Sequence, residues 1–104
     1  MAVTPLASTD AFVKFAATPG RNVLLDFRAD WCAPCRMLTP VLESLEAAHP
    51  DLLVGTVNVD ELPEVAAQFG VDSIPALFLL RDGKVVARAA GYMDQAALER
   101  RLGL

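Results

Sequence analysis

Short apolar runs that favour β-strands alternate with longer amphipathic stretches along most of this chain, and this alternation constrains the fold more than any other feature. The strand-like runs cover residues 23–27, 52–59, 76–80 and 85–89. The helix-like stretches begin near Ser8–Asp10, Ala33, Glu64 and Asp94. Strands that alternate with helices predict an α/β protein in which most strands pair in parallel.

Turn residues separate these segments. Thr18–Gly20 ends the first helix, and Pro63 stands where a short third helix should open. Asp82–Gly83 predicts a tight hairpin between the last two strands, which adds an antiparallel edge. We therefore expect a mixed sheet of four strands with helices on both faces. A fifth, weak edge strand within residues 1–7 is the alternative to irregular structure there, because Pro5 disfavours pairing.

The longest helix-like stretch, residues 33–49, contains apolar residues at helical spacing. The predicted buried face consists of Met37, Leu38, Val41, Leu42 and Leu45. Pro40 lies inside this stretch, so we expect a kink or a local break there.

Composition limits the class of protein. A chain of 104 residues fits one domain over residues 1–104, and 54% hydrophobic content argues against disorder. The longest apolar run, residues 74–80, is far shorter than the roughly 20 residues that span a bilayer. Nine basic residues are scattered through a chain of net charge −4, so we expect neither nucleic-acid nor membrane binding. The first ten residues lack a secretory signal pattern, which favours a soluble cytoplasmic protein.

The two cysteines, Cys32 and Cys35, have three possible roles: a structural disulfide, metal ligation or redox chemistry. A structural zinc site uses four Cys or His ligands, and His49 is the only histidine, so we expect no metal. A bridge between them closes a loop so small that chain entropy stabilises the fold by only roughly 2 kcal/mol. Reversible thiol chemistry is the favoured interpretation.

The position of the cysteines makes them unequal. Cys32 falls where a strand gives way to a helix, and the free N–H groups of a helix start stabilise a thiolate. Cys35 lies one turn further into the helix and should be more buried. Cys32 is therefore the expected nucleophile that attacks a target disulfide, and Cys35 the thiol that resolves the mixed disulfide.

Asp26 interrupts the apolar strand that precedes the cysteines. Burial favours the protonated acid, so its pKa should rise. We expect Asp26 to lie beneath the helix that carries Cys35 and to act as a buried general acid/base, taking the proton of that thiol. The alternatives are a solvated aspartate on an edge strand, or one satisfied by backbone donors.

Several motifs together resemble those of the thioredoxins. They are DFRADWCAPC, MLTP, NVD, FGVDSIP and DGKV, evenly spaced from about Asp10 to the C-terminus. The resemblance implies a thioredoxin-like three-layer sandwich and a general protein disulfide reductase acting through Cys32 and Cys35. A thiol oxidase or isomerase, or a non-redox binding module on the same fold, are the alternatives.

The resemblance also implies a docking surface and partners. The implied substrate-binding residues are Trp31, Ala33, Pro34, Ile74, Pro75 after a cis peptide bond, and Gly91. A core position for Trp31, a trans bond before Pro75 and a plain turn at Gly91 are the ordinary alternatives. The implied partners are disulfide-containing clients and a flavin-containing thioredoxin reductase that passes on electrons from NADPH. No cofactor is expected on this chain itself, and the expected state is a monomer.

Three positions depart from the family pattern. Ala33 replaces the usual glycine, which should affect redox poise little. Arg28 replaces a common aromatic residue; its cation either favours the Cys32 thiolate or pairs with Asp30. Thr56 replaces a frequent lysine, which should leave Asp26 less compensated and its pKa higher.

Overall fold

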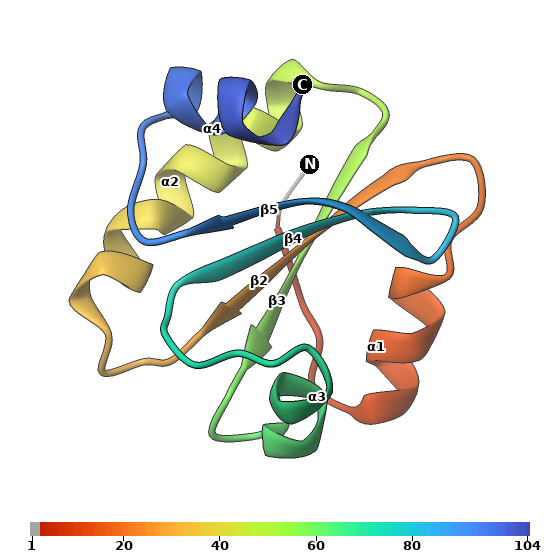
Figure 1. Cartoon of the computed structure of the whole chain (residues 1–104), viewed down its shortest axis with the longest axis vertical. Helices are drawn as coiled ribbons and strands as arrows, with labels where there is room; N and C mark the ends of the chain where they lie inside the picture. Colours follow the sequence, from red (N-terminus) through yellow and green to blue (C-terminus); the bar gives the residue numbers. More distant parts are fainter. Residues whose placement is uncertain (1–2) are drawn as a thin grey trace.

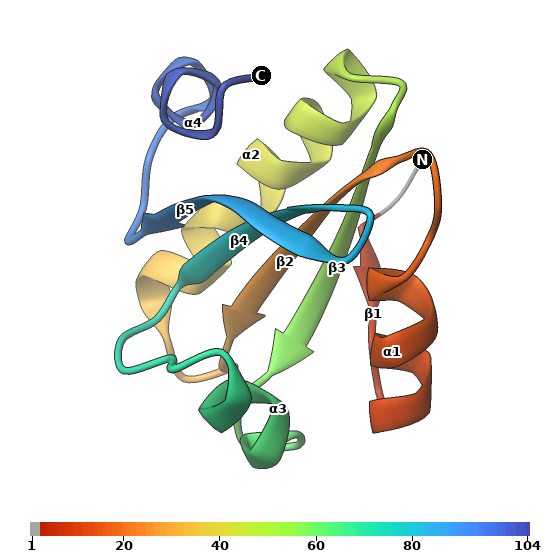
Figure 2. The ribbon, with the colours of Figure 1, turned by 45° about the vertical axis from the view of Figure 1, so that its right-hand side comes forward.

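The structure, a computed structural model, describes residues 3–104 and contains five strands and four helices (Figures 1 and 2). In chain order these are β1 (Thr4–Pro5), α1 (Thr9–Ala16), β2 (Asn22–Arg28), α2 (Ala33–Ala48), β3 (Leu52–Asn58), α3 (Pro63–Gln68), β4 (Ala76–Arg81), β5 (Lys84–Ala90) and α4 (Gln95–Leu102). All five strands form one sheet in the order β1-β3-β2-β4-β5. None of the helices in residues 3–104 has both the length and the apolar character needed to cross a bilayer.

The strand that carries Asp26 lies at the centre of the sheet. β2 pairs in parallel with β3 on one side and antiparallel with β4 on the other. Residues 23–27 are all buried, as their continuous apolar character predicts. This burial places Asp26 inside the protein rather than at an edge.

The direction of β4 differs from the parallel pairing expected from the strand–helix alternation, because β4 runs antiparallel to β2. The chain leaves β3 at Asn58 and re-enters the sheet at the same end, because Ala76, the first residue of β4, lies across from Phe27 near the end of β2. From there β4 can only run back along β2 in the opposite direction.

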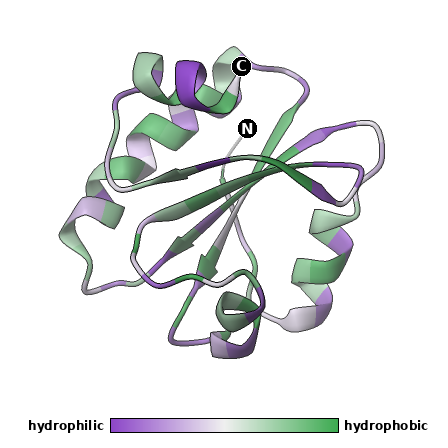
Figure 3. Cartoon of the chain, viewed as in Figure 1, coloured by the Kyte–Doolittle hydropathy of each residue, from purple (hydrophilic) through white to green (hydrophobic). Residues whose placement is uncertain are grey.

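The helices cover both faces of the sheet. Figures 1 and 2 show α2 and α4 on one face and α1 and α3 on the other. Figure 3 shows that the central strands consist largely of hydrophobic residues. The sheet separates two apolar cores, one centred on Leu24, Leu38, Leu42 and Leu77, and the other on Leu25, Phe27, Phe78 and Phe69. This arrangement confirms the predicted α/β sandwich with a mixed sheet.

Local signals fix the ends of several elements. The Ser8 hydroxyl oxygen accepts a hydrogen bond from the Ala11 N–H at 3.1 Å, and a carboxylate oxygen of Asp94 accepts one from the Ala97 N–H at 2.8 Å. The hairpin at Asp82–Gly83 has positive φ at both residues, 52° and 79°, as a type I′ turn requires. The predicted caps and hairpin are confirmed.

Helix α2 differs from expectation in two respects. It is continuous through Pro40, so the local break, one of the two effects expected of this proline, does not occur, although the missing N–H removes one internal hydrogen bond. Leu38, Leu42 and Leu45 are fully buried, but Met37 is exposed. Successive helical residues are about 100° apart, and Met37 falls outside the stripe that these leucines form.

Glu46, at the i+4 position from Leu42, is a buried acid that the sequence pattern did not indicate. Its Oε2 accepts a hydrogen bond from the backbone N–H of Val54 in β3 at 2.8 Å. A charge-assisted bond of this kind offsets part of the cost of burying a carboxylate. Glu46 therefore ties α2 to the sheet.

A first strand does form, although it is short. Thr4 and Pro5 pair in parallel with Gly55 and Thr56 of β3. Pro5 is tolerated because β1 is an edge strand. Residues 1 and 2, part of the segment considered for this strand, lie outside the described residues.

Candidate active site

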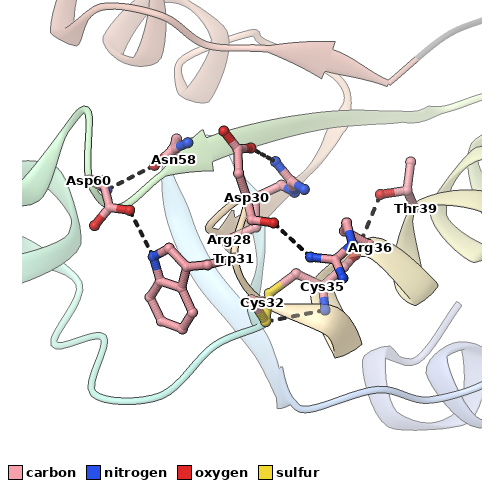
Figure 4. Close-up of polar contacts among 9 residues, drawn as sticks. All are labelled: Arg28, Asp30, Trp31, Cys32, Cys35, Arg36, Thr39, Asn58 and Asp60. Carbon is pink, nitrogen blue, oxygen red and sulfur yellow. Dashed lines mark hydrogen bonds and ion pairs between the residues drawn. A yellow bond between two sulfur atoms is a disulfide. The ribbon is translucent and has the colours of Figure 1, made fainter.

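The two cysteines lie at the junction between β2 and α2 and form a disulfide (Figure 4). Cys32 is the N-cap residue of α2, Ala33 is its first residue and Pro34 follows in the first turn. The Cys35 backbone N–H donates a hydrogen bond to Cys32 Sγ at 3.2 Å. After reduction, the same donor and the positive end of the helix can stabilise negative charge on the Cys32 sulfur.

The surroundings of the two sulfurs differ. Cys35 is 0% exposed and Cys32 is 5% exposed, and both pack against Ala29, Val59 and Ile74. Cys32 thus lies at the border of the buried cluster, while Cys35 is enclosed by α2 and the sheet. Of the two sulfurs, only the one of Cys32 borders the surface.

Two further loops meet the cysteines at this edge of the sheet. The Ile74–Pro75 peptide bond is cis, and Cys32 Sγ lies 3.9 Å from the Ile74 carbonyl oxygen. The Gly91 N–H donates to the Pro75 carbonyl oxygen at 2.9 Å, and Gly91 has a φ of 81°, which L-residues with side chains disfavour. The chain segments that precede β4 and follow β5 therefore meet at Pro75 and Gly91, and the first of them lies beside Cys32. Figures 1 and 2 show the two segments at the same end of the sheet.

Asp26 is fully buried, and neither carboxyl oxygen has a hydrogen-bond partner among residues 3–104. These facts contradict both alternatives, a solvated aspartate and one satisfied by backbone donors. Asp26 alternates with Leu25 and Phe27 and shares the α2 face of β2 with Leu24. Burial raises the pKa of Asp26 to about 7, and the positive charge of Arg28 limits that rise. A carboxyl group with this pKa can gain or lose a proton near neutral pH.

Trp31 is 69% exposed, which contradicts a core position. Its indole Nε1–H donates to Asp60 Oδ2 at 2.9 Å, and the Asp60 N–H donates to the Asn58 side chain at 2.9 Å (Figure 4). The ring borders a mostly apolar hollow of about 420 Å³. The other lining residues are Val59, Ala66, Val71, Asp72, Ser73 and Ile74. Asp60 was not predicted, because nothing in the sequence links it to a tryptophan 29 residues away.

Removing this acceptor should loosen the indole ring. In Asp60→Ala we expect lower fluorescence anisotropy of Trp31, the only tryptophan, since a lost hydrogen bond is worth about 1 kcal/mol. Asp72→Ala, which borders the same hollow, is the matched control. Unchanged anisotropy in Asp60→Ala would show that the bond does not hold the ring.

Two arginines contact Asp30 next to the cysteines. Arg28 Nη1 lies 3.2 Å from Asp30 Oδ1, and Arg36 Nη1 donates to the Asp30 carbonyl oxygen at 2.7 Å (Figure 4). Of the two alternatives for Arg28, the pair with Asp30 is present. Thr56 lies directly across from Asp26 in the β2–β3 register.

His49, for which the sequence analysis predicted no functional role, joins two helices. Its Nε2 lies 2.9 Å from Glu99 Oε2, which links the end of α2 to α4. This contact lies at the end of α2 opposite Cys32. Within residues 3–104, no group of three or more His, Cys, Asp or Glu side chains is arranged to hold a metal ion.

Comparisons with known proteins agree with this geometry. Residues 3–103 match the family model for thioredoxin. A thioredoxin from Chlamydia caviae is 52% identical over 95 residues and covers 91% of each chain, and one from Alicyclobacillus acidocaldarius is 46% identical with 90% coverage of each. A thioredoxin structure from Nicotiana alata has a TM-score of 0.86 at 34% identity, covering 94% of this chain and 87% of that one. A variant thioredoxin from Halobacterium salinarum also has a TM-score of 0.86 at 34% identity, with 99% and 93% coverage.

Proposed function

Since this chain belongs to the thioredoxin family of thiol–disulfide oxidoreductases, we propose that it reduces protein disulfides with Cys32 as the nucleophile and Cys35 as the resolving thiol. The observation that carries the proposal is the cysteine pair at the start of α2, in which Cys32 borders solvent and Cys35 is fully buried. Protein disulfide reductase function is the established activity of the family to which the chain belongs.

The exchange has two steps. The Cys32 thiolate attacks one sulfur of the client disulfide, the client S–S bond breaks, and the departing client thiolate takes up a proton. The Cys35 sulfur then attacks Cys32 Sγ, which releases the second client thiolate and closes the Cys32–Cys35 disulfide. Two electrons pass from this protein to the client. The Cys35 N–H that donates to Cys32 Sγ supports Cys32 as the nucleophile. The full burial of Cys35 supports its role as the resolving thiol.

Asp26 serves the second step as a general base. A thiol attacks as its thiolate, so Cys35 must lose its proton when the mixed disulfide is resolved. Asp26 is the buried acid on the sheet face that α2 covers, and its pKa of about 7 suits it to accept that proton near neutral pH. The acid then passes the proton to solvent or to the departing thiolate.

The docking surface consists of the groups around Cys32. Trp31, Ala33 and Pro34 flank the cysteine along the chain, while Ile74, Pro75 and Gly91 flank it in space. An extended client segment can pair with the backbone at Ile74, next to the sulfur. The apolar hollow beside Trp31 and Ile74 can receive a client side chain.

The proposed partners follow from the family. Disulfide-containing proteins are the clients, and a flavin-containing thioredoxin reductase that uses NADPH restores the dithiol. The protein is proposed to be a cytoplasmic monomer that needs no bound cofactor, because the two cysteines carry the electrons themselves.

Reduction of insulin disulfides tests the function. With dithiothreitol as recycling reductant, the protein should accelerate insulin precipitation far above the rate with dithiothreitol alone. A variant with both cysteines replaced by serine is the control and should give only the background rate. Equal rates for the native protein and this control would refute the proposed activity. Replacing dithiothreitol by NADPH and a bacterial thioredoxin reductase tests the electron source.

A further inference from the structure

We propose that Arg28 is a positioning residue that supplies the counter-charge to Asp26 and so sets the pH range in which this acid exchanges its proton. The proposal deepens the function proposed above and rests on it. The positive charge comes from β2 itself, because the residues of β3 and β4 that lie across from Asp26, Thr56 and Leu77, are uncharged.

The geometry of β2 brings Arg28 to the acid. Side chains two residues apart in a strand project from the same face, so Arg28 and Asp26 share the face that α2 covers. The Arg28 side chain is only 20% exposed, and its Nε is buried without a hydrogen-bond partner among residues 3–104. The guanidinium is therefore partly desolvated, with Nε shielded from bulk water and Nη1 at the surface beside Asp30.

The pair with Asp30 does not cancel this charge. The Asp30 side chain is 84% exposed, so water screens its carboxylate strongly. Only one guanidinium nitrogen, Nη1, reaches it, at 3.2 Å. A buried carboxyl group experiences the arginine charge more strongly, because little solvent separates two side chains that project from the same face of one strand.

Other groups on this face cannot replace Arg28. β3 presents Thr56 and β4 presents Leu77 directly beside Asp26. Helix α2 contributes Cys35, which titrates but carries no positive charge, and Glu46, a like charge that is bound to the Val54 N–H further along. The pKa of Asp26 agrees with this assignment, since burial raises it and Arg28 opposes the rise.

A hollow next to Thr56 allows a rescue experiment. This space, about 190 Å³, is lined by Arg28, Thr56, Asn58 and Glu61, among others. A lysine at position 56 would lie directly across from Asp26, and the hollow has room for its longer side chain. The positive charge can therefore be removed from β2 by replacing Arg28 and restored on β3 by Thr56→Lys.

The test is an NMR titration of the Asp26 carboxyl carbon in the reduced protein. In Arg28→Gln we expect its midpoint to rise by roughly one pH unit, the low end of the effect of a nearby opposite charge. Arg36→Gln is the matched control: it removes the same charge beside Asp30 from an exposed side chain and should leave the midpoint unchanged. Adding Thr56→Lys to Arg28→Gln should bring the midpoint back toward the native value.

Kinetics give a second readout. The pH at which resolution of a mixed disulfide reaches half its maximal rate should rise in Arg28→Gln by the same amount as the Asp26 midpoint. If Arg28→Gln does not fold, Arg28→Met removes the charge and keeps the apolar stem of the side chain. An unchanged Asp26 midpoint in the charge-free variant, or an equal shift in Arg36→Gln, would overturn the assignment. The titration does not depend on reductase activity, so failure of this inference is separable from failure of the insulin assay.

Discussion

A Cys35→Ser variant is expected to accumulate client proteins as mixed disulfides on Cys32 instead of turning over. Its Cys32 keeps the helix start and its border position at the surface, so the first attack proceeds. The second attack needs a sulfur at position 35, and a serine hydroxyl does not displace a thiolate. Non-reducing gels and mass spectrometry of the trapped adducts measure this outcome and identify the clients.

The matched control is Cys32→Ser. It leaves only the enclosed Cys35, which is 0% exposed and out of reach of a client, so both trapping and insulin reduction should be lost. Alkylation of the reduced native protein gives an independent check, since iodoacetamide should label Cys32 much faster than Cys35 near neutral pH. Equal trapping by the two variants would contradict the division of roles between the sulfurs.

Replacement of Asp26 by asparagine should stabilise the oxidised protein at pH 8 by several kcal/mol and have little effect near pH 3. The unfolded carboxyl ionises near 3.8, whereas the folded one keeps its proton until about 7. Between these values the folded state binds more protons than the unfolded state, so the stability of the native protein falls as pH rises. Above pH 7 the loss is complete and amounts to about 4 kcal/mol, or 1.4 kcal/mol per pH unit.

Urea unfolding of the oxidised protein at several pH values measures this effect. The free energy of unfolding of the native protein should decline between pH 4 and pH 7, while that of Asp26→Asn should follow a flatter curve. Asp51→Asn is the control. It alters an exposed aspartate that directly precedes β3 and lies beside Asn22 at the start of β2, so it should reproduce the native profile. A gain of the same size at pH 3 and pH 8 would show that the stabilisation arises from packing and not from ionisation.

Much of the site could be predicted from local patterns. The five buried residues 23–27 form a continuous apolar run, which is typical of a central strand, and this run places the acid inside the protein. The cysteines follow directly where that strand ends, and Pro34 marks the first turn of a helix. Their unequal burial follows from that junction.

Other features depended on contacts between distant parts of the chain. Asp60 reaches the Trp31 indole from 29 residues away, and the Ile74 carbonyl approaches Cys32 from 42 residues away. Met37 was assigned to the buried face by its apolar character, but the helix turns it toward solvent. Periodicity shows which residues can share a face, and packing decides which faces are covered.

The sequence by itself determined the order of helices and strands, the burial of Asp26 and the placement of both cysteines at a helix start, because these follow from propensities and spacings that act over a few residues. The tertiary structure decided the antiparallel direction of β4, the approach of the Ile74 carbonyl to Cys32 and the hydrogen bond between Trp31 and Asp60. The physical reason is that these features depend on contacts between residues far apart in the chain, and such contacts are set only when the layers pack together.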